Sequence, residues 1–121
     1  MQHYSKLEVW RRSHKLVLDM YRATLGFPIS EKFALVSQLR RAAFSVPANI
    51  AEGSRRITAR DYVRFLNIAE GSLSEMEYFV VLSRDLEYLT PLLATKYLRE
   101  IAEVSKMLCC LRKSVQLDIP Q

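Results

Sequence analysis

The residues best suited to binding chemistry in this 121-residue chain are arginines, concentrated between positions 40 and 64. The six are Arg40, Arg41, Arg55, Arg56, Arg60 and Arg64. The same stretch contains no lysine, and its only acidic residues are Glu52 and Asp61. A guanidinium group binds phosphate oxygens through a planar fork of N–H donors, which a lysine cannot offer. The pattern predicts a surface that contacts the phosphates of RNA or DNA.

The positive charge of the chain is concentrated in the half that contains these arginines, as a phosphate-binding surface requires. The net charge is +5; residues 1–64 carry 12 Lys and Arg against 5 Asp and Glu, and residues 65–121 carry 6 against 8. The first half is therefore +7 and the second half −2. Such asymmetry favours a polyanionic partner, with Arg11 and Arg12 as weaker additions to the contact surface.

An alternative interpretation of the same arginines is structural. They could be solvated, or they could form ion pairs with Glu52, Asp61, acidic residues of the following helix or a neighbouring subunit. In that case the protein would be an interaction scaffold or accessory subunit with no direct role on nucleic acid.

Residues for catalysis or metal binding are scarce. The only histidines are His3 and His14, and neither follows a glutamate by three residues, as a di-iron bundle requires. No Gly-rich phosphate loop, zinc motif or nucleophile elbow is present. We expect Asn49 and Glu52 to make structural hydrogen bonds. The sequence predicts no catalytic, cofactor or metal site, and hence a protein that is not an enzyme.

The cysteines and the apolar runs predict a soluble cytoplasmic protein. Cys109 and Cys110 are neighbours that point roughly 100° apart on a helix, which disfavours a disulfide between them. The segment MQHYSKLEVW lacks the apolar region of a signal peptide. The longest apolar run, residues 78–82, is far shorter than the roughly 20 residues of a membrane helix.

The elements that position these residues are predicted to be helices. Half of the chain is apolar, and three Gly and four Pro leave few turns. Apolar residues recur every three or four positions in four segments, at about 6–25, 31–52, 59–88 and 91–116. We therefore predict a single all-α domain over residues 1–121, folded as an antiparallel up-down-up-down four-helix bundle.

Helix starts are predicted from capping residues. Ser5 with Glu8 and Thr58 with Asp61 have the spacing of capping boxes, and Ser30 is a candidate cap for the second helix. Thr90 followed by Pro91 predicts the start of the fourth helix. On the first helix, the predicted core stripe is Leu7, Trp10, His14, Val17, Tyr21 and Leu25.

The second helix has the most distinctive pattern. Its predicted inward stripe is Leu35, Leu39, Ala42, Val46 and Ile50. Pro47 predicts a kink, and Gly53 a left-handed C-terminal residue. Residues 42–51 are apolar nearly all round, which predicts cover on both sides and hence contact with another subunit. In the third helix, Gly71 is expected to permit a close helix approach.

Three stretches together resemble one protein family. YSKLEVWRRSHKLVLDMY, QLRRAAFSVPANIAEGSRR and FLNIAEGSLSEMEY are similar to the four-helix bundle proteins encoded by intervening sequences in bacterial 23S rRNA genes. The resemblance covers residues 4 to about 113. In fold, that family resembles the accessory variability protein of diversity-generating retroelements.

The resemblance implies a small cytoplasmic protein that assembles as a homopentamer. For the retroelement relatives it also implies binding to nucleic acid and to a reverse transcriptase. Together with the arginine pattern, it leads to the hypothesis of a non-enzymatic homo-oligomer that binds RNA or DNA electrostatically and largely without sequence specificity.

Overall fold

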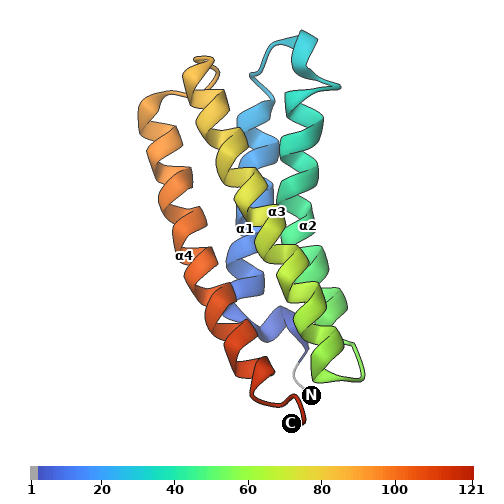
Figure 1. Ribbon diagram of the computed structural model, residues 1–121. Coiled ribbons are helices and arrows are strands. Elements are labelled where there is room, and N and C mark those ends of the chain that lie inside the picture. Colours follow the sequence, from blue (N-terminus) through green and yellow to red (C-terminus); the bar gives the residue numbers. More distant parts are fainter. Residues whose placement is uncertain (1–2) are drawn as a thin grey trace.

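The computed structural model describes residues 3–121 and contains four long helices (Figure 1). They are α1 (Glu8–Thr24), α2 (Leu35–Ser54), α3 (Ala59–Asp85) and α4 (Pro91–Gln116). Two short 3-10 helices, η1 (Tyr4–Lys6) and η2 (Ile29–Glu31), precede α1 and α2. No strand occurs within the described residues.

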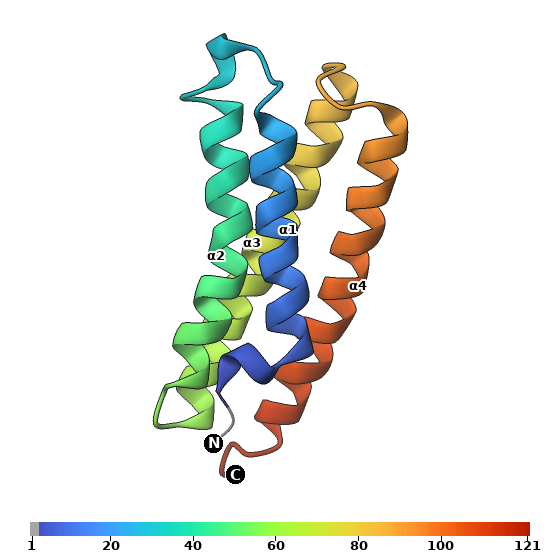
Figure 2. The ribbon, with the colours of Figure 1, turned by 180° about the vertical axis from the view of Figure 1, so that it is seen from behind.

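The helices run alternately up and down, and each packs against the next in sequence (Figure 1). Seen from behind, α1 lies between α2 and α4 and closes the bundle (Figure 2). The α2–α3 connection and both ends of the chain lie at one end of the bundle (Figure 1). We call this end, formed by residues 3–8, 54–64 and 113–121, the base. The predicted all-α bundle is confirmed.

Three of the four helices present the faces that their spacing predicts. On α2, the predicted stripe from Leu35 to Ile50 is buried in full. On α3 and α4, the apolar positions repeat at spacings of four and three and enter the same core. The buried apolar residues of these two helices are Val63, Leu66, Ala69, Leu73, Met76, Val80, Ala94, Tyr97, Ile101, Val104, Leu108 and Val115.

On α1 the predicted core face is only partly right: Val17 is buried and Leu7 and Trp10 pack half-buried against the core, but Tyr21 is exposed. His14 is exposed and stacks on Trp10 at 5.1 Å between ring centroids, and Leu25 is 79% exposed. The face that enters the core consists of Val9, Ser13, Leu16, Val17, Met20 and Thr24. Ser13 and Thr24 can be buried because their hydroxyls donate to the carbonyls of Trp10 and Met20.

Of the four predicted helix caps, two are confirmed and two are wrong. Thr58 and Thr90 do cap α3 and α4, accepting from the backbone N–H groups of Asp61 and Leu93. Ser5 and Ser30 instead lie inside the 3-10 helices. Neither α1 nor α2 has a side-chain cap, and α2 begins four residues later than predicted.

Neither glycine has the role predicted for it. Gly53 lies within α2 and does not have a positive φ. A Cβ added there would lie 2.9 Å from Cβ of Phe65 and 2.9 Å from Cδ1 of Tyr62, so α2 and α3 meet closely at this point. At Gly71 an added Cβ would meet nothing within 4 Å. The close approach between the two helices is therefore at Gly53 and not at Gly71. The helix α2 continues unbroken through Pro47.

Within one molecule, the other helices already cover much of the apolar surface of α2 at residues 42–51. Ala43 and Pro47, on the side expected to meet another subunit, are buried within one molecule. Phe44 is 46% exposed and Ala48 is exposed. The surface left for another subunit on α2 is thus narrower than the sequence predicts.

We predict opposite stability effects for Gly53→Ala and Gly71→Ala. Gly53→Ala should lower the free energy of unfolding by about 1–3 kcal/mol, because the new methyl group meets Cβ of Phe65, which cannot move without α3. Gly71→Ala should raise it by about 0.5–1 kcal/mol, because alanine favours the helix and meets no neighbour. Urea unfolding measures both changes. Equal effects at the two positions would contradict the close α2–α3 approach.

A second prediction concerns the ion pair between α1 and α4. Arg12 donates twice to Glu100, at 2.9 Å from both Nε and Nη2, and these bonds hold the pKa of the Glu100 carboxyl below its usual range. The stabilisation is therefore present above the ordinary pKa of a glutamate and is lost as pH falls through the lowered one. Glu100→Gln should cost about 1 kcal/mol at pH 7, and this difference should disappear in acid.

Thermal unfolding of Glu100→Gln and the parent from pH 7 to pH 2 measures this dependence. Glu77→Gln, an exposed position on α3, is the matched control and should show no such trend. A difference that stays constant over the whole range would contradict the predicted role of the Glu100 carboxylate.

Candidate nucleic-acid interface

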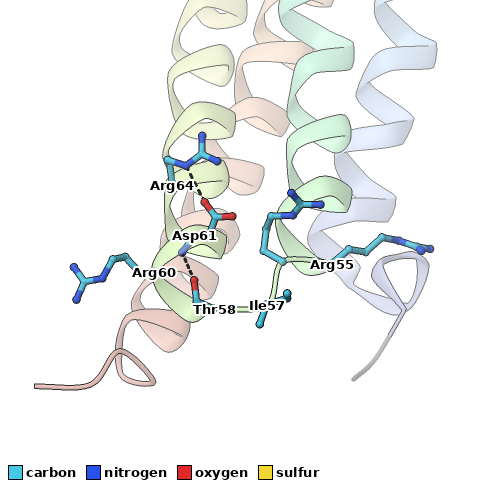
Figure 3. Close-up of a pocket in the computed structure, with 7 residues that line it drawn as sticks. Arg55, Ile57, Thr58, Arg60, Asp61 and Arg64 are labelled. Atoms are coloured by element: carbon cyan, nitrogen blue, oxygen red, sulfur yellow. Dashed lines mark hydrogen bonds and ion pairs between the residues drawn. The ribbon is translucent and has the colours of Figure 1, made fainter.

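An open hollow of about 670 Å³ lies at the base, where α2 passes into α3 (Figure 3). We call it the arginine hollow. Its lining residues are Arg55, Arg56, Ile57, Thr58, Arg60, Asp61 and Arg64. Four of the six predicted contact residues therefore line the same hollow.

The local structure explains why these four come together. Arg55 follows the last residue of α2, and its N–H bonds to the carbonyls of Glu52 and Gly53. Thr58 then caps α3, so only residues 55–58 separate the two helices. The short connection places Arg55 and Arg56 beside the first turn and a half of α3, which carries Arg60 and Arg64.

Arg64 and Arg56 each have an acidic partner. Arg64 Nε lies 2.9 Å from Asp61, and Arg56 Nη2 lies 3.3 Å from Glu52. Both guanidinium groups also lie over the ring of Phe65, at 4.4 Å for Arg64 and 5.6 Å for Arg56. The buried Nε of Arg56 has no hydrogen-bond partner among residues 3–121.

Arg55 and Arg60 have no carboxylate partner within the described residues. Arg55 Nη2 lies 2.9 Å from Nε2 of His3, and its guanidinium is 5.5 Å from the ring centre of Tyr4. Arg60 is exposed, and Figure 3 shows it pointing away from the bundle on the side opposite to Arg55. The four arginines thus fan out over the base and do not converge on one point.

Arg40 and Arg41 do not belong to this group. They lie roughly 20 Å further along α2, at about 1.5 Å per residue. Arg40 Nε donates to Thr24 at 2.9 Å, and its guanidinium lies 4.5 Å from the ring centre of Tyr21. Arg41 pairs with Glu75 of α3 at 2.9 Å. Arg40 therefore links α2 to α1, and Arg41 links α2 to α3.

The two weaker candidates are also engaged elsewhere. Arg11 pairs with Glu8, and it donates to the carbonyls of Ser5 and Lys6 at the end of η1. Arg12 bridges α1 to α4 through Glu100. Neither lines the arginine hollow.

The electrostatics of the hollow favour an anion. Its lining carries four guanidinium groups and one carboxylate. The Arg64–Asp61 and Arg56–Glu52 pairs are about half-exposed, so each contributes little to stability and can open for another acceptor. A guanidinium group lies on an aromatic ring through the flat face of the guanidinium. The N–H donors in the guanidinium plane therefore remain available to phosphate oxygens.

A second, more apolar pocket of about 300 Å³ adjoins the hollow, and sequence reasoning missed it. We call it the side pocket. It is lined by Leu7, Ser54, Arg56, Ile57, Thr58, Ala59, Tyr62, Val115 and Asp118. Burial of the Tyr62 ring raises the pKa of its hydroxyl. The only signal in the sequence was Ile57, an apolar residue in a polar connection.

The other polar residues singled out in the sequence make local contacts. Asn49 donates to the Ser45 carbonyl at 2.7 Å, and the Ser45 hydroxyl lies 2.8 Å from that of Ser72 on α3. Residues 3–121 contain no group of three His, Cys, Asp or Glu side chains placed to hold a metal ion. Cys109 and Cys110 are free thiols. Within the same residues, no helix combines the length and the hydropathy needed to cross a bilayer.

Comparison with known proteins gives a family but no activity. The crystal structure of a protein of unknown function from the S23 ribosomal protein family of Bacteroides thetaiotaomicron superposes with a TM-score of 0.78 at 25% sequence identity, covering 87% of this chain and 98% of that one. No curated protein matches the chain. The family model of the 23S rRNA-intervening sequence proteins matches residues 5–110. The chain therefore belongs to the 23S rRNA-intervening sequence protein family.

Proposed function

We propose that this protein is a cytoplasmic, non-enzymatic homo-oligomer that binds RNA or DNA through backbone phosphates at the base of the bundle. One observation carries the proposal: four arginines and a single carboxylate line one open hollow. Guanidinium groups are the side chains best matched to phosphate oxygens. Free thiols at Cys109 and Cys110 agree with a reducing compartment.

The uncompensated charge at the base distinguishes this proposal from a purely structural role. Arg40, Arg41 and Arg12 each join two helices through defined partners. Arg55 and Arg60 make no such link between the long helices. The proposed contact set is accordingly Arg55, Arg56, Arg60 and Arg64, without the arginine pair further along α2.

Binding through these residues should depend little on base sequence. Contacts to phosphate fix the position of a nucleic acid but do not read its bases. The arginines fan over the base of the bundle (Figure 3), which suits successive phosphates of a strand better than a single small anion. The affinity should fall steeply with salt, because counterions released from the nucleic acid drive association.

Self-association is the second part of the proposal. Phe44 on α2 and Ile68 on α3 are 46% and 43% exposed. The Ser45–Ser72 contact places this stretch of α2 beside that stretch of α3, and Ala48 and Gly71 add small exposed surface there. A ring of five chains, which the family resemblance implies, would cover this patch and present five bundle bases to one nucleic acid, raising the avidity.

A second candidate function is an accessory scaffold for another protein, such as a reverse transcriptase. The internal roles of Arg40 and Arg41 favour it, because they show that part of the arginine set serves packing. Exposed apolar residues at the end opposite the base, Leu25, Ile29 and Phe33, offer a surface for such a partner. In this case loss of charge at the base would leave the partner's binding intact.

We predict that the triple variant Arg55→Ala/Arg60→Ala/Arg64→Ala binds a 20-nucleotide RNA roughly 10- to 100-fold more weakly than the parent at 50 mM salt. The slope of log K against log salt should also become shallower, by about 0.7 for each phosphate of a single strand that the variant no longer neutralises. Fluorescence anisotropy at several salt concentrations measures both quantities, with RNA and with DNA.

The matched control is Arg22→Ala/Lys96→Ala/Arg99→Ala, which removes the same charge from exposed positions on α1 and α4 away from the base. It should retain the parent slope. No binding by the parent even at low ionic strength, or equally weakened binding in both variants, would rule out the base as a nucleic-acid site. Loss of the oligomer in the base variant alone would favour the scaffold.

We also predict that the parent has a solution mass near five times its 14.1 kDa chain mass, and that Phe44→Asp lowers it. A carboxylate in a covered apolar patch loses its hydration without gaining a partner, so the interface should weaken. Leu92→Asp, at an 81% exposed position on α4, is the control and should keep the parent mass. Multi-angle light scattering decides, and a monomeric parent contradicts the assembly.

A further inference from the structure

We propose that the side pocket accepts one unpaired nucleobase, so that the preferred ligand of this end of the bundle is single-stranded nucleic acid. The inference rests on the proposed function and deepens it. In the proposed arrangement the strand's phosphates lie in the arginine hollow, and one nucleobase turns from the strand into the neighbouring pocket.

The two cavities are adjacent and share a wall. Arg56, Ile57 and Thr58 line both of them. The volume of the side pocket, about 300 Å³, is at the lower end of the roughly 300–1,000 Å³ typical of small-molecule sites. It therefore has room for one ring system and leaves the sugar and phosphate outside, on the arginine side.

The walls of the side pocket suit a flat, apolar face. Its apolar lining includes Leu7, which immediately precedes α1, Tyr62 of α3 and Val115 near the end of α4. Ile57 is fully exposed, at 101% of its reference area, so nothing in the described chain covers it. A nucleobase inserted between these groups would remove apolar surface from water on both partners.

Two polar groups of the pocket match the edge of a nucleobase. Arg56 lines the pocket, and its buried Nε–H has no acceptor among residues 3–121, which is unfavourable as long as no ligand supplies one. Asp118 contributes a carboxylate, which accepts hydrogen bonds. A nucleobase carries ring and carbonyl acceptors for the first group and amino or imino donors for the second.

Only an unpaired nucleobase can use this site. In a duplex the nucleobases are stacked and paired, so their faces and Watson–Crick edges are unavailable to a pocket on the protein surface. A duplex can still place phosphates against Arg55, Arg60 and Arg64. Single strands should therefore gain an increment of affinity that duplexes do not, and that increment should be apolar and insensitive to salt.

The test uses Ile57→Ala, which truncates the apolar side chain that lines both cavities and leaves every charge in place. Ile29→Ala is the matched control, because Ile29 is also an isoleucine between long helices, 87% exposed, at the other end of the bundle. Both variants should melt at the parent temperature. The probes are a 12-nucleotide RNA and the duplex formed with its complement, compared at equal salt by fluorescence anisotropy.

We expect the parent to bind the single strand more tightly than the duplex. Ile57→Ala should weaken single-strand binding roughly 3- to 10-fold with an unchanged salt slope, and should leave duplex binding unaltered. Ile29→Ala should match the parent on both probes.

Equal affinity of the parent for both probes, or an Ile57→Ala variant equal to the parent on the single strand, would overturn the inference. If binding to both probes still depended on Arg55, Arg60 and Arg64, the phosphate interface would stand without the nucleobase pocket. If neither probe bound at low salt, both proposals would fall together.

Discussion

The close contact between α2 and α3 at Gly53 is the constraint from which the base of the bundle follows. With no Cβ at this position, the end of α2 lies directly against Phe65 and Tyr62 of α3. The two helices are therefore already in contact when the chain reverses, and residues 55–58 suffice to connect them. The same contact sets the places of four arginines, the ring of Phe65 beneath two of them and the Tyr62 wall of the side pocket.

The arginines of this chain differ in function because their neighbours differ. Arg40 lies beside the C-terminal turn of α1, where Tyr21 and Thr24 offer oxygen acceptors and the helix dipole favours a cation. Arg60 lies in the first turn of α3, where the dipole disfavours one. The position of Arg40 therefore stabilises the folded state, whereas the position of Arg60 does not. The anion-binding role proposed for this surface would explain why a charge that opposes local stability is placed there.

The sequence predicted those parts of the structure that depend on local pattern. The stripes of α3 and α4 follow from apolar residues at regular spacing, and Thr58 and Thr90 follow from their helix-start signals. The face of α1 followed only in part, because Ser13 and Thr24 are buried through hydrogen bonds that polarity alone does not predict. Nor did the roles of Gly53 and Gly71, because these depend on what the opposing helix places there. The same distinction applies to the candidate site: a short connection groups Arg55 with Arg64, whereas the walls of the side pocket meet only in the folded bundle.

The arrangement of charge and apolar surface bears on how a small bundle could hold a long polymer. One bundle base offers four guanidinium groups, two of them already paired with exposed carboxylates, so a single chain can supply only a few phosphate contacts. If several such bases belonged to one assembly, every contact after the first would be intramolecular. The high effective concentration of the neighbouring bases would then compensate for the weak binding of a single chain. On the proposed function, the apolar patch at Phe44 and Ile68 and the arginines at the base would act together. The patch would join the chains, and the arginines of the joined bases would bind the strand.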